Sequence, residues 1–255
     1  MALFKSSNPV ISEKRLRSTI IPQEVSTAGG MTIRGTINKF GFMLFMLLTA
    51  SVYAWRVQAL GGNAVPLIWG GMIGGFIVAL IIIFKTHWAP YLAPLYAMLE
   101  GLFIGAISAF FNGAFAETAP NIVFNAVGLT LGVCVSMFFL YRFRIIKVTK
   151  MFRSIIISAT AGIAIFYLIV MVMRAFGFQG MAFLHEGTTL GIGFSLFVVG
   201  IASLNLLLDF DMIENGVKMG APKYMEWFCA FGLMVTIVWL YLEILRLLSK
   251  LSSRN

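Results

Sequence analysis

The sequence predicts an all-α integral membrane protein, a bundle of seven transmembrane helices. Hydrophobic residues make up 60% of the 255 residues, and only 11% are charged, whereas about 25% of residues are charged in a typical soluble domain. A soluble protein could not cover so apolar an interior with so few polar side chains. The third observation is the distribution of the apolar residues, which fall into seven separate runs.

Each apolar run has the length of about 20 residues that a membrane-spanning helix needs. The predicted spans are residues 37–59, 65–84, 91–115, 119–141, 153–174, 187–213 and 222–248. Backbone groups in lipid must be paired within the segment, so these spans are expected to be helices. Short connections predict antiparallel neighbours in one transmembrane domain, residues 37–250. Residues 1–36 carry Ser, Thr, Pro, Gly and mixed charges without periodicity, which predicts a mobile, basic cytosolic tail.

The placement of the charges predicts the orientation. Six of the 19 Lys and Arg lie at or before Lys39, and five more lie between Arg142 and Arg153. The positive-inside rule therefore predicts a cytoplasmic N-terminus, and the net charge of +9 indicates an anionic bilayer surface as the partner rather than nucleic acid. Seven spans place the basic C-terminus outside, so an eighth, re-entrant segment or a wrongly assigned span is an alternative.

Small residues at four-residue spacing predict closely packed helices, because they let two backbones approach where lipid supplies no hydrophobic drive. The pairs are Gly70 with Gly74, Gly71 with Gly75, Gly101 with Gly105, and Gly128 with Gly132. Such pairs carry no information about function.

Acidic residues inside the predicted spans are the candidates for function, because a charge there costs about 2.5–3.5 kcal/mol on insertion scales. Glu100 lies near the middle of the third span. It is interpreted either as a packing residue, buried and hydrogen-bonded to a neighbouring helix, or as part of a cavity that responds to protons or cations.

Two more acids and an acid–base pair occur in the last two spans. Asp209 and Asp211 are two residues apart, so they point to roughly opposite sides of a helix. Asp209 shares a face with Asn205 and is expected to point inward, whereas Asp211 is expected to be an interfacial charge. Glu243 and Arg246 are three residues apart and lie on one face. They form an ion pair, or Arg246 extends to the membrane surface instead.

The segment LDFDMI at residues 208–213 and the segment WLYLEILRLL at residues 239–248 resemble the Bax inhibitor-1 family, in its bacterial YccA-like branch. The Glu100-Gly101 pair, followed by Gly105, fits the same family. The resemblance implies a seven-helix protein of the bacterial plasma membrane, with the last helix central and enclosed by the other six. It also implies a function, because some members conduct Ca²⁺ as a slow, pH-sensitive leak.

The resemblance assigns roles to individual residues. Asp209 takes the place of a sixth-helix aspartate that pairs with an acid of the seventh helix, and Arg246 takes the place of an assisting arginine. For the seventh-helix partner, an ungapped match gives Thr236, the Leu-Tyr-Leu-acid pattern gives Glu243, and similar depth in the membrane gives Glu226. The candidate residues of the ion pathway are therefore Asp209, Arg246, Glu100, Glu226, Glu243 and Asp211.

Two functions follow from these patterns. The first is a Ca²⁺ leak gated by protonation, with Ca²⁺ as the permeant ion and no resident cofactor; oxygen ligands suit Ca²⁺. The second is a non-conducting membrane interaction protein that modulates a membrane-bound protease. An enzyme is not expected, because His87 and His185 are far apart and Cys134 and Cys229 lie in apolar runs without metal or redox spacing. No metal site is assigned.

Overall fold

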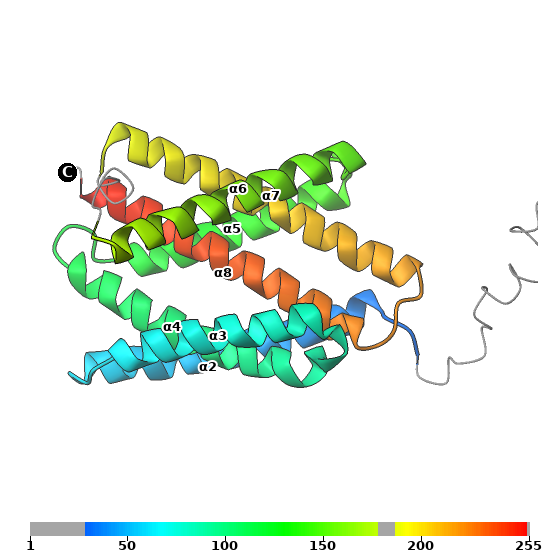
Figure 1. The fold of residues 1–255 in the computed structure, drawn as a ribbon, viewed down its shortest axis with the longest axis horizontal. Coiled ribbons are helices and arrows are strands. Elements are labelled where there is room, and N and C mark those ends of the chain that lie inside the picture. Colours follow the sequence, from blue (N-terminus) through cyan, green and yellow to red (C-terminus); the bar gives the residue numbers. More distant parts are fainter. Residues whose placement is uncertain (1–28, 178–186, 254–255) are drawn as a thin grey trace, which may run out of the picture.

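The computed structural model describes residues 29–177 and 187–253. These residues form seven helices that are long and apolar enough to cross a membrane, and they contain no strand. The helices, antiparallel along the chain (Figure 1), are α2 (Ile33–Ala59), α3 (Val65–Phe84), α4 (Ala89–Ala114), α5 (Ile122–Arg142), α6 (Lys150–Ala175), α7 (Thr189–Lys218) and α8 (Met225–Ser252), with a short 3₁₀ helix η1 (Thr86–Trp88) before α4. The predicted fold class is confirmed, and the protein is an integral membrane protein.

The first helix begins earlier than predicted. α2 starts at Ile33 rather than at residue 37, because the Thr32 side chain caps it by accepting a hydrogen bond of 2.9 Å from the backbone N–H of Gly35. Met31, just before the cap, is already buried against α7 and α8. The last residues of the predicted tail therefore belong to the bundle, and residues 1–28 lie outside the described part of the chain.

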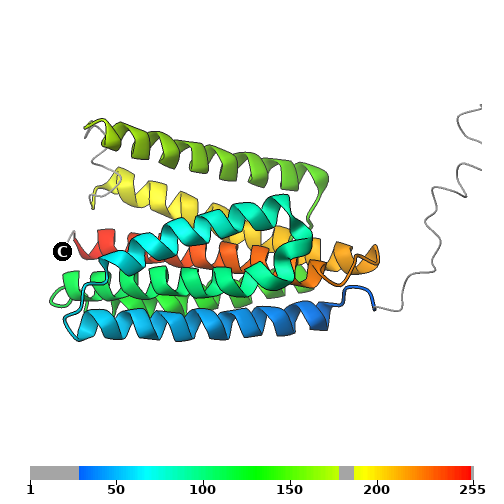
Figure 2. The same cartoon turned by 60° about the horizontal axis from the view of Figure 1, so that its bottom comes forward.

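The last helix is the central one. In its apolar stretch 67% of the residues are buried, against 44% in α4 and α7 and 17–22% in the other helices. α8 packs against α2, α4, α5 and α7, whereas α3 packs mainly on α4 and α6 on α7. Figure 2 shows α6 at the edge of the bundle, beyond α7. The prediction of a central last helix is confirmed.

Glycines bring α2 and α4 together. A Cβ atom added to Gly101 would lie 2.3 Å from the carbonyl oxygen of Leu47, and one added to Gly105 would lie 2.2 Å from that of Ser51. Both obstacles are backbone atoms, so only glycine permits this approach. Gly71 of α3 meets α4 in the same way. The predicted role in packing is confirmed for Gly71, Gly101 and Gly105, whereas a Cβ at Gly70 would meet no described atom within 4 Å.

The predicted pair Gly128 and Gly132 of α5 does not mediate a close helix contact. No atom of residues 29–177 or 187–253 lies within 4 Å of a Cβ built at either position. The buried side of α5 includes Ala126 and Thr130, which are two residues from Gly128 and therefore on the opposite side of the helix. Spacing alone predicted a pair, but the orientation of α5 turns it away from the bundle.

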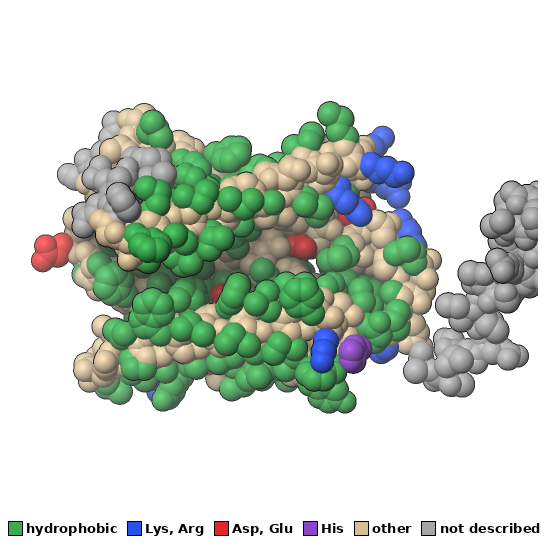
Figure 3. Space-filling model, viewed as in Figure 1, with side chains coloured by type: hydrophobic (Ala, Val, Ile, Leu, Met, Phe, Trp, Pro, Cys, Tyr) green, Lys and Arg blue, Asp and Glu red, His purple; other side chains and the backbone are tan. Residues whose placement is uncertain are grey.

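Basic side chains gather at one end of the bundle, on the right in Figure 3. This basic end is where α2, α4, α6 and α8 begin and where α3, α5 and α7 end. The opposite end, here called the far end, has fewer cations; those in the described ranges are Arg56, Arg174, Arg246 and Lys250. The positive-inside rule predicts that the basic end faces the cytoplasm.

Candidate functional site along the central helix

The polar contacts of α8 fall at three levels of the bundle. Glu226 lies in its first turn, Thr236 near its middle and Glu243 in its last third. At 1.5 Å per residue, Thr236 is about 15 Å and Glu243 about 25 Å farther along the axis than Glu226. The three levels are therefore separate sites rather than one cluster of acids.

Glu226 fastens the start of α8 to the start of α2. Its side chain is fully buried, and Oε1 accepts hydrogen bonds of 2.9 Å from both the backbone N–H and the hydroxyl of Thr32. Lys39 forms an ion pair with Oε2, and the Nζ of Lys223 lies 3.3 Å from Oε1. Because these groups occupy both oxygens, Glu226 is not the partner of Asp209, although similar depth had suggested it.

Asp209 lies on α7 at the level of the middle of α8. A Cβ atom at Gly232 would lie 3.9 Å from its Oδ1, and the Thr236 hydroxyl is the hydrogen-bonding group beside it. Thr236 also donates to the carbonyl of Gly232 at 3.2 Å, and one hydroxyl proton serves only one acceptor. Of the three partners considered from the sequence, the structure places Thr236 beside Asp209.

The second carboxylate oxygen of Asp209 differs from the buried carboxylate oxygens of Glu226 and Glu243, which are all hydrogen-bonded or ion-paired. Oδ2 is buried and has no hydrogen-bond partner among the described residues. A buried polar atom without a partner costs about 1–3 kcal/mol, and more if it is charged. Asn205, from which the inward direction of Asp209 was predicted, donates instead to the hydroxyl of Thr160 on α6, at 2.8 Å.

Asp211 points away from Asp209, as the helical spacing predicted. Its Oδ2 lies 2.5 Å from Nη2 of Arg153 on α6 and accepts a hydrogen bond of 2.9 Å from Asn215. The Arg153 side chain is half exposed, and an ion pair so open to its surroundings contributes little to stability. The structure does not bring Asp211 together with the other candidate acids.

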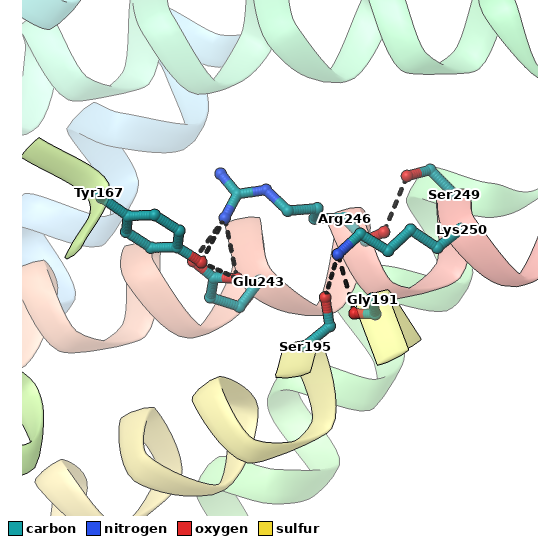
Figure 4. A network of polar contacts seen from close by, with 7 residues as sticks. All are labelled: Tyr167, Gly191, Ser195, Glu243, Arg246, Ser249 and Lys250. Atoms are coloured by element: carbon teal, nitrogen blue, oxygen red, sulfur yellow. Dashed lines mark hydrogen bonds and ion pairs between the residues drawn. The ribbon is translucent and has the colours of Figure 1, made fainter. Parts of the chain in front are cut away.

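The predicted ion pair of Glu243 and Arg246 is present in the last third of α8, toward the far end of the bundle (Figure 4). Glu243 is buried, and Nη1 of Arg246 donates to its Oε1 at 2.8 Å and to its Oε2 at 3.0 Å. The Tyr167 hydroxyl of α6 donates to Glu243 at 3.1 Å and accepts from Arg246 at 2.9 Å. This triangle ties α6 to the central helix and satisfies the Glu243 carboxylate, so Glu243 is not the partner of Asp209 either.

A buried lysine next to this triangle was not predicted. Lys250 is 2% exposed, and its Nζ donates to the Ser195 hydroxyl at 2.7 Å and to the carbonyl of Gly191 at 3.0 Å. The sequence signal was its spacing, since Lys250 is four residues after Arg246 and so on the same helix face. Lys250 therefore joins α8 to α7 at the far-end level, beside the triangle that joins α8 to α6.

Glu100 lies apart from α8, against α3. A Cβ atom on Gly75 would lie 3.1 Å from its Oε2, and the polar group beside the carboxyl is the Tyr96 hydroxyl, one turn earlier on α4 itself. The expected hydrogen bond to a neighbouring helix is therefore not found among the described residues, because the facing residue is a glycine without a side chain. Those residues also hold no group of three or more His, Cys, Asp or Glu suited to a metal ion.

Comparison with known proteins adds two findings. The chain is 32% identical over 127 residues to the phosphate transport system permease protein PstC of Xylella fastidiosa strain 9a5c, and 31% identical over 130 residues to PstC of a second strain. Each match covers 46% of this chain and 38% of the permease, so the chain spans about two fifths of the length of these relatives. The family model described as Bax inhibitor 1 like matches residues 8–253. With its seven helices and central last helix, this chain belongs to the Bax inhibitor 1-like family.

Proposed function

We propose that this protein is a cation leak pathway through the membrane, with Ca²⁺ as the permeant ion and Asp209 as the group that senses protons. The observation that carries the proposal is the buried Oδ2 of Asp209, which has no partner among the described residues. Binding of a proton or a cation would remove the cost of that unpaired oxygen. Carboxylate oxygens are also the ligands that Ca²⁺ prefers.

One face of the bundle shows acidic groups within its membrane-spanning part. Figure 3 shows a hollow in the middle of one face, with acidic side-chain atoms in it. In the same view the ribbon of α8 runs between α3 and α4 on one side and α6 and α7 on the other (Figure 1). The hollow lies between the two ends of the bundle, so its acidic atoms belong to the membrane-spanning part of the protein.

The proton-sensing role follows from electrostatics. A divalent cation 4 Å from an ionised carboxylate gains about 8 kcal/mol at an effective dielectric constant of 20, and protonation removes nearly all of that attraction. Conduction requires binding strong enough for entry and weak enough for exit. The protonation state of Asp209 therefore changes the flux, whereas the neutral Thr236 beside it cannot compensate the lost charge.

The test is Ca²⁺ uptake into liposomes that contain only the purified protein, measured at one acidic and one alkaline pH. Wild-type flux is expected to differ between the two, and Asp209→Asn is expected to give the same flux at both, because the amide keeps the shape but does not titrate. Asp211→Asn is the matched control, since it makes the same change two residues away on the other side of α7, and it is expected to keep the wild-type pH dependence.

Either of two results would count against the proposal. Full pH dependence in Asp209→Asn would show that another group senses the proton. No Ca²⁺ uptake by the wild type would favour the non-conducting alternative, a membrane protein that modulates a membrane-bound protease. The partial likeness to phosphate permeases agrees with a role in transport, but the carboxylate at the middle level favours a cation as the cargo.

A further inference from the structure

An apolar groove runs along the outside of the bundle toward the far end. It has a volume of about 630 Å³, its walls are α2 and α5, and its floor is formed by α4 and α8. Leu48 and Val52 line one wall, Val127 and Leu131 the other, and all four side chains are exposed. The volume lies in the range of about 300–1,000 Å³ that is typical of ligand sites.

The hydroxyl groups that line the groove are already hydrogen-bonded within the protein. The Ser51 Oγ lies 2.9 Å from the carbonyl oxygens of both Leu47 and Gly101, which share its one proton. The Ser108 hydroxyl is 2.6 Å from that of Tyr241, and Thr130 donates to a carbonyl of its own helix at 2.7 Å. The groove therefore offers a largely hydrocarbon-like surface, in which the hydroxyls are already engaged within the protein.

The length of the groove matches one leaflet. Along α2 the lining runs from Leu44 to Arg56, which is about 18 Å at 1.5 Å per residue. Half of the hydrocarbon core of a bilayer is about 15 Å. Along α5 it begins at Val123, one residue after the helix start at the far end, and reaches Leu131. An acyl chain that enters from the far-end surface would thus follow the groove to the middle of the bilayer.

A basic side chain lies at the open end of the groove. Arg56 lies in the last turn of α2, is exposed, and forms no ion pair with any residue in the described ranges. Trp55, next to it, also lines the groove, and tryptophan favours the level of the lipid headgroups. We propose that the groove binds one anionic glycerophospholipid, with an acyl chain between α2 and α5 and the phosphate on the Arg56 guanidinium, which matches phosphate oxygens with two donors.

The test uses Trp55 as a local reporter. The single-tryptophan protein replaces the other four tryptophans by phenylalanine: Trp69, Trp88, Trp227 and Trp239. Its fluorescence is measured in bilayers that mix phosphatidylglycerol and phosphatidylcholine, with bromine on the acyl chains of one lipid at a time, so the relative quenching gives the relative binding of the two lipids. The reference is a protein that keeps only Trp69, which is exposed near the far end of α3, outside the groove.

Trp55 is expected to report a preference for phosphatidylglycerol of about fivefold, the scale of one basic residue at an anionic surface, and Trp69 no preference. Arg56→Gln is expected to remove the preference. The matched control Arg174→Gln, also in the last turn of a helix that ends at the far end, is expected to keep it. Val127→Phe, which narrows the groove, is expected to lower quenching of Trp55 by both lipids.

Four results would overturn the proposal. Equal selectivity at Trp55 and Trp69 would mean ordinary boundary lipid, and a preference that survives Arg56→Gln would mean that the headgroup binds elsewhere. Loss of the preference on adding inorganic phosphate would indicate a site for free anions rather than for a lipid. Unchanged quenching in Val127→Phe would show that no acyl chain enters the groove. Circular dichroism and a single size-exclusion peak confirm that each variant is folded.

Discussion

The contact between Glu226 and the start of α2 is expected to hold the basic end of the bundle closed, and Glu226→Gln tests it. The carboxylate accepts two hydrogen bonds of 2.9 Å from Thr32 and pairs with Lys39. The glutamine oxygen accepts as a neutral atom, so about one charge-assisted hydrogen bond of roughly 1.5–3 kcal/mol is lost together with the attraction to Lys39. Because Lys39 still reaches solvent, its attraction to Glu226 adds little. We therefore expect the free energy needed to open this end of the bundle to fall by about 2–3 kcal/mol.

A buried thiol reports the opening. Cys229 lies one turn after Glu226 and is 1% exposed, packed against Met31 and Ile213. In a background in which Cys134 is replaced by alanine, the rate at which a thiol reagent labels Cys229 measures the population of the open state. A loss of about 2–3 kcal/mol raises that rate roughly thirty- to a hundred-and-fifty-fold.

The control for this prediction is Glu214→Gln. Glu214 is partly exposed and pairs with the exposed Lys218 at 2.5 Å, so this change is expected to leave the labelling rate of Cys229 nearly unchanged. An unaltered rate and an unaltered unfolding temperature in Glu226→Gln would refute the argument that this carboxylate fastens α2 to α8.

Two further predictions concern packing and orientation. Gly101→Ala places a Cβ atom 2.3 Å from the carbonyl of Leu47 and is expected to lower the unfolding temperature in detergent. The control Gly128→Ala has open space around it among the described residues and is expected to be neutral or to stabilise the protein by up to about 1 kcal/mol. Equal effects of the two changes would contradict the packing argument. In a variant without native cysteines, a cysteine at Lys147 is expected to react only from the cytoplasmic side and one at Leu60 only from the opposite side, and labelling of both from one side would refute the topology.

The sequence alone determined the fold class and the extent of most spans. α3 was predicted within its observed limits, and α5 and α6 to within three residues at either end. The reason is local, because a chain in lipid must satisfy its backbone within each helix and therefore needs a run of apolar residues of a defined length. The pairing of Glu243 with Arg246 was predictable because it is also local, since both residues lie on one turn of one helix.

Only the tertiary structure decided which buried acids are satisfied. Glu226 and Asp209 were both candidates, but Glu226 is bound by Thr32, 194 residues away in the chain. Asp209 instead faces a threonine and keeps one oxygen without a partner in the part of the chain that the structure describes. The rotation of each helix also decided that Gly101 contacts a backbone and Gly128 does not. Spacing within a helix specifies which residues share a face. Which helix lies opposite that face depends on packing among segments that are distant in sequence. The free-energy cost of a buried charge depends on that neighbouring helix, because only a nearby polar group can offset it.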